Sequence, residues 1–436
     1  MNTRTFLFLQ GPASPFMRRL AAALESQNVA VRRINFSIGD AVFWWPKHGD
    51  WFTGRQKDWP QFLTRYILEH RVSDLLMLGD GRAVHADAAN VAIALGVRVH
   101  ILEHGYLRPD WLTVEPDGMS AHSRFPRDPQ AITALADGQP VADTTRLFRS
   151  SFLTYALYDL AYHIPNVVLG WLVHPHYRTH GAAHPVVEYS GWIGKAFKRK
   201  RRAKNAQASI CAWARHHPGT PASSAPPLFF FPLQLPGDYQ IIRHAPGGDL
   251  YRIVHAVIAS FARHAPVDAR LLFKIHPIDN GLSRWPSRIG EAARRHDVSD
   301  RVFLADGGDT DVLIERATGI VTVNSTVGLT ALYAGKPVIA LGAAVYDVEG
   351  LTSQGPLADF WNNPTPPDPV LLDRFLRALA ATTQVRGGFI GEEAVATGVA
   401  AVATRLMETQ ERLPLSFRKD RSEKKFRYAA ELSPGE

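Results

Sequence analysis

The sequence of 436 residues contains a single cysteine, Cys211. No disulfide can form within the chain, so a secreted scaffold held together by disulfides is disfavoured. The residues around Cys211 have the pattern of an amphipathic helix, which indicates a packed thiol rather than a nucleophile. The first apolar run, Phe6–Leu9, is ended by Gln10, Gly11 and Pro12 and is too short for the core of a signal peptide. We expect this run to be a buried strand.

Long apolar runs are also absent. No stretch reaches the ~18 consecutive apolar residues that a membrane-spanning helix needs. The stretch that comes nearest is 150–177, and it is interrupted by Asp159, His163, Pro165 and Asn166. A cytoplasmic protein is therefore the expectation.

Several nucleotide-binding and nucleic-acid-binding motifs are missing. The pattern GxxxxGK[ST] does not occur, and no GxGxxG follows the first strand, so a P-loop NTPase and a nicotinamide-dependent dehydrogenase are disfavoured. Zinc-finger spacing, an aromatic RNA-binding signature and a helix-turn-helix pattern are absent too. The net charge is +8 and the pI about 9.6, so these absences count against nucleic acid as the partner of the basic residues.

The basic residues gather in two runs, at 195–204 and 417–428. Such runs are usually solvated helix faces. The anionic surface of a membrane is a second interpretation, since each basic residue near it contributes about 1 kcal/mol. Aromatic residues that could enter an interface lie in these runs: Phe197, Phe417, Phe426 and Tyr428. We rank a membrane surface above nucleic acid as the partner.

Strand-like and helix-like segments alternate in the first part of the chain. Strands are predicted over 4–11, 29–36, 72–81 and 97–107, and helices over 14–28, 58–71 and 85–96. This β-α-β alternation with short turns is typical of a parallel, doubly wound sheet. In such sheets the loops at the carboxyl ends of the strands build ligand sites.

A second alternation follows a Pro- and Ser-rich stretch at 216–227, which is interpreted as a linker. Strands are predicted over 228–235, 269–277, 301–306, 319–325 and 336–342, with helices between them, and the chain from about 367 onward is predicted to be helical with a basic tail. We expect an acceptor-side Rossmann-like domain with a helical insert at 1–215, a nucleotide-sugar-binding Rossmann-like domain at 216–366, and C-terminal helices and tail at 367–436. Two parallel-sheet domains facing across a cleft would be a GT-B-like α/β fold.

A His-Pro pair closes one strand of the second domain. Pro277 biases His276 to an extended conformation, and an imidazole at a strand tip can bind a phosphate. Lys274 lies two residues earlier and would project to the same strand face. A turn proline with an incidental histidine is the simpler alternative.

Another strand of this domain ends in Asn324, Ser325 and Thr326. Ser325 or Thr326 can cap the helix that follows, where free backbone N–H groups and the helix dipole favour an anion. An ordinary helix cap is the alternative. Because both polar tips end strands of one domain, we expect them to bind a nucleotide phosphate together.

The strands of the first domain end in glycines and polar residues: Gly11, Asp80, Arg82, His85, Glu103, His104 and Gly105. A carboxylate at such a tip can act as a general base or as a nucleophile. Asp80 in "GDG" could equally make a turn of its own. Asp80, Glu103 and His104 stay open as candidates for the catalytic group.

Eight stretches together resemble the capsule polysaccharide biosynthesis and export family, in its KpsS (LipB-like) branch. They are 8–24, 32–40, 78–85, 103–111, 230–241, 274–277, 323–342 and 346–361. The resemblance implies a retaining β-Kdo transferase that uses CMP-Kdo and starts a poly-Kdo linker on a lyso-phosphatidylglycerol lipid. The alternatives are a non-catalytic export factor that binds lipid-linked glycan, and a sugar-nucleotide epimerase that would need a UDP-sugar.

The resemblance also implies site residues. The family shares a His-Pro motif and a Ser/Thr pair with bacterial sialyltransferases, and His276-Pro277 and Ser325-Thr326 match them as contacts to CMP. Its acidic-acidic-Gly motif is matched only in part, because His104 stands in the second position between Glu103 and Gly105. We expect Glu103 to be acid/base or nucleophile, with His104 assisting.

The implied chemistry needs neither a metal nor another cofactor, because a monophosphate nucleotide leaves with modest charge. The implied partners are CMP-Kdo, a phosphatidylglycerol-type acceptor, the anionic membrane surface and other capsule assembly proteins, with no nucleic acid. The protein would work as a cytoplasmic, peripheral protein on the inner face of a bacterial inner membrane, docked by the basic runs 195–204 and 417–428.

Overall fold

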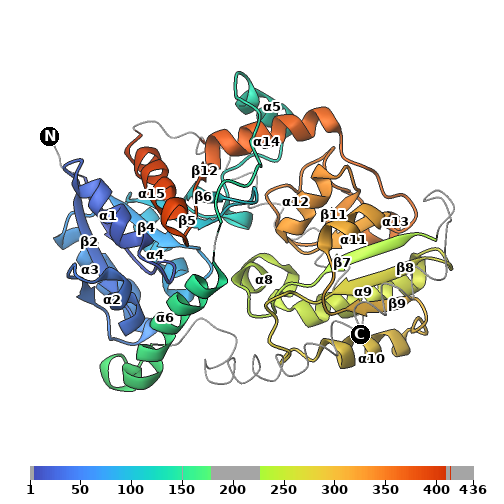
Figure 1. Ribbon diagram of the computed structural model, residues 1–436, viewed down its shortest axis with the longest axis horizontal. Coiled ribbons are helices and arrows are strands. Elements are labelled where there is room, and N and C mark those ends of the chain that lie inside the picture. Colours follow the sequence, from blue (N-terminus) through green and yellow to red (C-terminus); the bar gives the residue numbers. More distant parts are fainter. Residues whose placement is uncertain (1–3, 150, 178–225, 409–412, 414–436) are drawn as a thin grey trace. The chain divides into compact units, whose positions relative to one another are not determined.

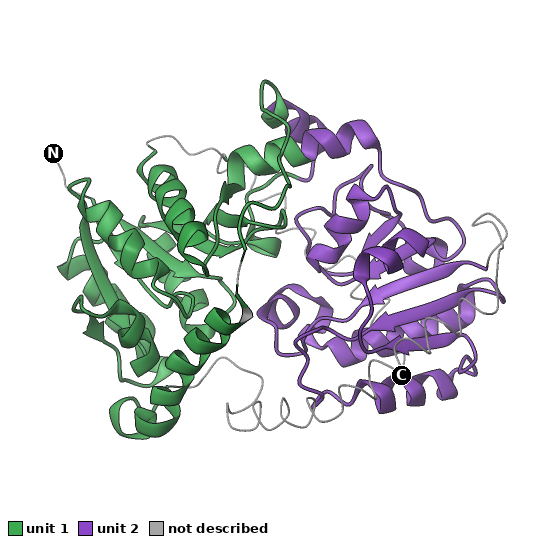
Figure 2. Cartoon of the chain, viewed as in Figure 1, with its two compact units in different colours: residues 1–126, 135–180, 376–422 green, residues 127–134, 181–375, 423–436 purple. Residues whose placement is uncertain are grey.

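The computed structural model describes residues 4–149, 151–177, 226–408 and 413 (Figure 1). Two compact units divide the chain (Figure 2). Unit 1 holds residues 1–126, 135–180 and 376–422, and unit 2 holds residues 127–134, 181–375 and 423–436. Cys211 and the basic runs 195–204 and 417–428 lie outside the described residues.

Unit 1 is built on a sheet of seven strands in the order β12-β6-β5-β4-β1-β2-β3. Its strands are β1 (Thr5–Phe8), β2 (Ala30–Asn35), β3 (Asp50–Trp51), β4 (Asp74–Leu78), β5 (Arg98–His104), β6 (Trp111–Pro116) and β12 (Gln384–Arg386). The five strands from β3 to β5 are parallel, whereas β6 runs antiparallel to β5 and β12 antiparallel to β6.

Six helices of unit 1 accompany this sheet in the described part of the chain. They are α1 (Phe16–Glu25), α2 (Ile38–Trp44), α3 (Trp59–Glu69), α4 (Ala83–Ala94), α6 (Phe152–Val173) and α15 (Glu392–Met407). Helix α6 packs on the helix α2. Phe16, Leu20 and Leu24 recur at helical spacing in α1 and are fully buried. They share one core with Val395 and Val399 of α15, so the late helix α15 packs on the early helix α1.

Unit 2 has a five-stranded parallel sheet in the order β11-β10-β7-β8-β9. Its strands are β7 (Leu228–Pro232), β8 (Arg270–Lys274), β9 (Val302–Ala305), β10 (Gly319–Thr322) and β11 (Val338–Ala340). Its helices are α8 (Tyr239–His244), α9 (Leu250–His264), α10 (Trp285–Arg295), α11 (Thr310–Arg316), α12 (Thr326–Tyr333) and α13 (Leu357–Phe360). Strands β7, β10 and β11 are buried along their whole length, as a parallel sheet covered on both faces requires, whereas the edge strand β9 is mostly half-buried.

The two sheets share one winding order. From β1 the chain adds β2 and β3 on one side and then returns to the other side of β1 for β4 and β5. Unit 2 repeats this order from β7 through β8 and β9 and back to β10 and β11. The direction therefore reverses between β1 and β4 and between β7 and β10, where ligands bind in open sheets of this kind. The prediction of two Rossmann-like α/β units is confirmed.

Several elements were not predicted from the sequence. They include α2, β3, the antiparallel strand β6 and β12. Two helices, α5 (Pro129–Ala136) and α14 (Pro369–Thr383), contain residues of both units. The segment after 367, predicted to be helical throughout, contains β12, which joins the sheet of unit 1. None of the described helices is long and apolar enough to cross a membrane.

A buried carboxylate anchors the amino end of the sheet in unit 1. Asp74 is fully buried and accepts hydrogen bonds from Arg4 Nε (3.1 Å), Arg98 Nε (2.8 Å) and His100 Nε2 (2.9 Å). Burial alone would raise the pKa of Asp74, but the hydrogen bonds from His100, Arg4 and Arg98 hold it well below its usual range. This charged end lies opposite the candidate site, which is at the carboxyl end of the strands.

Candidate functional site

In unit 2 two amides meet where the strand order reverses. Gln234 follows β7 and Asn324 follows β10, and Gln234 Nε2 donates to Asn324 Oδ1 over 2.9 Å. Asn324 Nδ2 in turn donates to the carbonyl of Gln240 in α8, also over 2.9 Å. Asn324 therefore fixes the ends of two strands and a helix at the point where a ligand is expected.

Ser325 is the N-cap of α12, as the sequence predicted for Ser325 or Thr326. Its side chain accepts a hydrogen bond from Val327 N at 3.2 Å. The Tyr346 hydroxyl donates to the carbonyl of Ser325 over 2.5 Å. A Cβ on Gly328 would lie 2.3 Å from that hydroxyl, so only glycine lets Tyr346 approach the first turn of α12. Burial raises the pKa of Tyr346 far above its usual value and keeps the hydroxyl a donor.

The His-Pro turn lies at the same edge of this sheet. Strands β8 and β10 flank β7 and run parallel to it, so their carboxyl ends are ~10 Å apart at the usual strand spacing. His276 is half-buried, and its Nδ1 accepts the N–H of Ile278 over 3.3 Å. Its imidazole therefore helps to shape the turn in which it lies.

The expectation that Lys274 and His276 share one strand face does not apply, because β8 ends at Lys274 and the alternation of side chains ends with it. Lys274 is buried. Burial lowers the pKa of Lys274, while the nearby carboxylates of Asp309 and Asp306 act in the opposite direction. Lys274 therefore lies toward the end of β9, which precedes both aspartates.

In unit 1 the corresponding point between β1 and β4 holds a buried polar network. Gln10, which follows β1, donates from Nε2 to Asp40 Oδ2 (3.0 Å) and to the hydroxyls of Tyr177 (3.0 Å) and Tyr162 (3.3 Å). Arg33 lies 3.5 Å from Asp40 Oδ1. Burial lowers the pKa of Arg33, and the carboxylate of Asp40 counteracts that shift. The sequence did not single out these residues, although Gln10 lies at the end of the predicted strand 4–11 and Asp40 shortly after the predicted strand 29–36.

Asp40 also closes the start of α2. Its Oδ2 accepts the backbone N–H groups of Phe36 and Ser37, both at 3.0 Å, and Ser37 Oγ accepts the N–H of Asp40 in return. This reciprocal arrangement is a capping box. The loop after β2 is thereby joined to the loop after β1.

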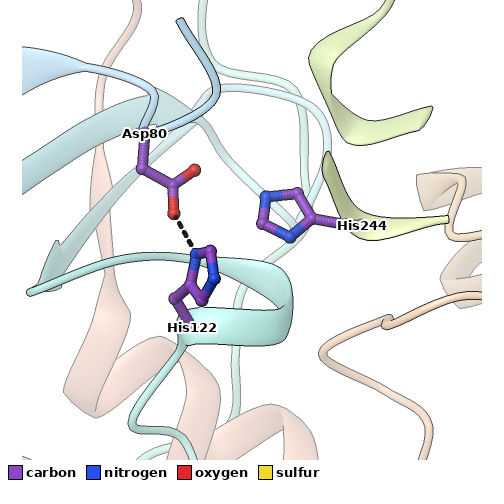
Figure 3. A group of neighbouring side chains, drawn as sticks. All are labelled: Asp80, His122 and His244. Carbon is purple, nitrogen blue, oxygen red and sulfur yellow. Dashed lines mark hydrogen bonds and ion pairs between the residues drawn. The ribbon is translucent and has the colours of Figure 1, made fainter. Parts of the chain in front are cut away.

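Asp80 follows β4 and holds the turn after β6. Its Oδ2 accepts the N–H of Met119 at 3.1 Å and lies 3.1 Å from Nδ1 of His122 (Figure 3). Asp80 is only 6% exposed. These bonds reach residues about forty positions away. Asp80 therefore holds distant parts of the chain together, whereas the simpler interpretation from the sequence was a local turn.

Arg82 precedes α4 and His85 lies in its first turn. His85 is fully buried, and its Nδ1–H donates to the carbonyls of Leu78 (3.0 Å) and Gly79 (2.9 Å). Burial lowers the pKa of His85 to about 3, and the charge of Arg82 adds to the shift. Nε2 of His85 and one terminal nitrogen of Arg82 are buried and have no hydrogen-bond partner among the residues that the structure describes.

Glu103 and His104 end strand β5. Glu103 Oε1 accepts the N–H of His104 at 2.9 Å, and the His104 ring meets Phe389 edge-on at 5.0 Å. Gly79, with φ +63°, lies against the same carboxylate, because a Cβ there would be 3.1 Å from Glu103 Oε2. Arg108 is close enough to Glu103 for electrostatic attraction. The carboxylate of Glu103 and the turn that carries Asp80 are therefore neighbours at the ends of β5 and β4.

The two glycines predicted at the site allow close packing. A Cβ on Gly11 would lie 2.3 Å from the Met17 side chain, and one on Gly105 would lie 2.5 Å from the carbonyl oxygen of Trp111. Gly11 also lines a small pocket with Arg33 and Asp40. Gly105 is where β5 turns toward β6.

Residues 73–390 match the family described as capsule polysaccharide biosynthesis protein. The chain belongs to this family. Among curated relatives, the capsule polysaccharide modification protein LipB of Neisseria meningitidis serogroup A is 30% identical over 90% of this chain and 93% of that protein. The capsule polysaccharide export protein KpsS of Escherichia coli is 30% identical over 88% of this chain and 96% of that protein.

Solved structures give this capsule family member more distant matches. KpsC of Thermosulfurimonas dismutans, described as a β-Kdo 2,7 transferase, aligns with 93% of this chain and 100% of that chain at 15% identity and a TM-score of 0.46. The strand order and the parallel registers of the two sheets define the Rossmann-like fold of each unit.

Proposed function

We propose that this capsule family protein is a retaining glycosyltransferase that moves β-Kdo from CMP-Kdo to a (lyso)phosphatidylglycerol lipid and so starts the poly-Kdo linker of a capsular polysaccharide. The observation that carries the proposal is the set of polar groups at the point where the sheet of unit 2 reverses its strand order. Family membership supports the link to capsule synthesis, and the resemblance of the sequence motifs supports the donor.

On the donor side, the phosphate of CMP would lie at the first turn of α12. The positive end of the helix dipole stabilises an anion there, and the N–H groups of Val327 and Gly328 bond to Ser325, which shapes the turn. Asn324 and the cap residue Ser325 hold this turn in place, and the turn of His276 lies at the same edge of the sheet. Donors held in advance stabilise the charge that grows on the departing phosphate.

In the reaction, the anomeric carbon of Kdo exchanges its bond to the CMP phosphate oxygen for a bond to a lipid hydroxyl oxygen. The hydroxyl proton passes to a base, and CMP departs. Retention requires either a double displacement on a carboxylate or attack from the face that CMP leaves. We assign the acid/base or nucleophile role to Glu103, with His104 assisting and Asp80 as the remaining candidate. No step in this scheme requires a metal.

The direct test is a reaction of the purified full chain with CMP-Kdo and lyso-phosphatidylglycerol, followed by mass analysis. The expected result is a lipid heavier by one or more Kdo residues, with CMP released in equal amount. The alternative is a non-catalytic factor that binds lipid-linked glycan, which the name of the export protein from E. coli favours. That alternative predicts glycan binding without release of CMP, and this outcome would end the transferase proposal.

The lipid acceptor implies a location on the inner face of the inner membrane. We propose that the basic runs 195–204 and 417–428 dock the protein there through anionic headgroups. Flotation with anionic vesicles tests this role. Removal of residues 417–436 should weaken vesicle binding, and unchanged binding would exclude the tail as a docking segment.

A further inference from the structure

Helix α6 has its polar side turned toward the protein. Tyr162, Asn166 and Gly170 recur every four residues and are buried. Asn166 Oδ1 accepts the N–H of Gly39 over 2.8 Å. His174, which follows the helix, continues this row, and its Nε2 accepts the N–H of Ile38 over 3.1 Å.

The packing of this polar side on α2 is close. A Cβ on Gly39 would lie 2.6 Å from the carbonyl oxygen of Tyr162. The rings of Phe43 in α2 and Tyr158 in α6 meet edge-on at 5.6 Å. The two helices lie side by side in Figure 1. The orientation of α6 is therefore fixed by several independent contacts.

The opposite side of α6 is apolar and exposed. From Leu153 to Trp171 its large apolar side chains recur at spacings of three and four residues, and Leu172 adjoins the last of them. We call this row the α6 stripe: Leu153, Leu157, Leu160, Ile164, Val168, Trp171 and Leu172. Trp171 is 72% exposed, and Leu153 is 67% exposed. A helix on a globular protein normally buries such a row and exposes its polar side. The α6 stripe reverses that rule, which marks an interaction surface.

The surroundings of the stripe match a lipid interface. The acidic residue and the histidine of α6, Asp159 and His163, lie within 3.7 Å of each other and are half-buried, away from the stripe. Exposed Arg146 and Arg149 precede the helix, and the basic run 195–204 follows it in the sequence. Such a helix, flanked by basic residues and carrying an exposed tryptophan, lies in the plane of a membrane with its apolar side in the acyl region.

We propose that the α6 stripe is a membrane-docking surface that inserts into the interface of an anionic bilayer. The helix has 22 residues and is ~33 Å long at the usual rise, and it is not apolar enough to span a bilayer. Val42 in α2 and Trp45, which follows that helix, are exposed apolar residues as well. The inference extends the proposed function by naming the surface that brings a lipid acceptor to the protein.

The test compares two triple variants of the full chain on vesicles of phosphatidylglycerol mixed equally with phosphatidylcholine. One carries Leu157→Gln, Ile164→Gln and Val168→Gln in the stripe. The matched control carries Leu68→Gln, Val267→Gln and Val370→Gln, which are exposed apolar residues outside α6. We expect the stripe variant to lose vesicle affinity by about tenfold or more, since each change removes apolar area that the bilayer would bury. The control variant should bind as the unsubstituted protein does.

A second readout reports insertion directly. Brominated acyl chains quench the fluorescence of a tryptophan that reaches them. The unsubstituted protein should therefore lose fluorescence on brominated vesicles, and Trp171→Phe should lose less. Far-ultraviolet circular dichroism and the melting temperature should stay unchanged in the stripe variant.

Three results would overturn the proposal. Unchanged vesicle binding of the stripe variant would do so directly. If the stripe variant melts at a lower temperature but binds vesicles unchanged, other residues of this chain cover the stripe. If the stripe variant loses a dimer that the unsubstituted protein forms in sedimentation, a second copy of the chain covers it. Vesicle binding needs neither CMP-Kdo nor an acceptor, so it can succeed where the transfer reaction fails, and the reverse also holds.

Discussion

Gln234 and Asn324 join the ends of β7 and β10 through a 2.9 Å hydrogen bond, at the point where the sheet of unit 2 reverses its strand order. The two residues are ninety positions apart in the sequence. Their contact brings the first turn of α12 into register with the loop after β7. The bridge holds the turn at which the proposed donor phosphate would bind.

Asn324→Ala removes the bridge and should weaken CMP binding by about tenfold or more, because the buried Gln234 loses its partner and the α12 turn loses its anchor. Isothermal titration with CMP measures the change. The control is Asn363→Ala, an exposed asparagine of the same unit, which should bind CMP as the unsubstituted protein does. Equal affinity of both variants for CMP would show that Asn324 does not contribute to the donor site.

Glu103→Gln keeps the size of the side chain and removes its charge. Loss of a group that transfers a proton or attacks the sugar should lower kcat about a hundredfold or more, while CMP affinity stays the same. Initial rates of CMP release measure kcat, with Glu69→Gln, an exposed change in α3, as the control. Near-normal transfer by Glu103→Gln would show that Glu103 is not the catalytic group. Asp80→Asn and His104→Ala would then test the remaining candidates.

Gly328→Ala should destabilise unit 2, because the added Cβ would lie 2.3 Å from the Tyr346 hydroxyl. Overpacking of this kind costs about 1–3 kcal/mol of unfolding free energy. Gly290→Ala, in the interior of α10, meets its nearest atom at 3.4 Å and should instead stabilise by about 0.5–1 kcal/mol. Urea unfolding at neutral pH gives both values. A stable Gly328→Ala protein would show that Tyr346 moves freely.

His85 predicts an acid-sensitive fold. Its pKa is lowered to about 3 by burial, compared with about 6.5 in an unfolded chain, so the unfolded state binds the extra proton first as the pH falls. The stability of the neutral, buried form is fully present above about pH 6.5 and is lost progressively down to about pH 3. At pH 5 this loss from His85 is about 2 kcal/mol.

The measurement is urea unfolding at pH 7 and pH 5 for the unsubstituted protein and for His85→Asn, whose amide can still donate to the carbonyls of Leu78 and Gly79. The free energy of unfolding should fall between pH 7 and pH 5 by about 2 kcal/mol less in the variant than in the unsubstituted protein. The comparison uses the change with pH, so a variant that is weaker at both pH values still tests it. An identical change in both proteins would show that His85 does not titrate on unfolding.

Long, uniformly apolar strands and amphipathic helices could be predicted from the sequence, because their burial depends on their own side chains. Strand β12 could not, because Gln384 and Arg386 are polar and the strand exists only through pairing with β6, about 270 residues earlier. Helix α2 has only seven residues and depends on the capping box of Ser37 and Asp40. Local pattern carries no signal for pairings made at such distances along the chain.

The candidate site divides in the same way. Ser325 and His276 could be found because each follows an apolar strand with a polar group in a turn. The network of Gln10, Asp40 and Tyr162 could not, since its members are 30 to 152 positions apart and none forms a motif by itself. The inverted polarity of α6 is likewise visible only once α2 is seen to pack on its polar side.

The chain leaves unit 1 before its sheet and core are complete. Phe16 packs edge-on against Phe389 at 5.0 Å, and β12 supplies the last strand of a sheet that begins at residue 5. On the ribosome, the sheet of unit 2 at 228–340 must emerge before α1 can receive its cover. Nascent chains halted after residue 375 should therefore contain an incomplete unit 1 in which the apolar face of α1 is exposed. A chaperone would bind this state, and crosslinking at Phe16 would detect it.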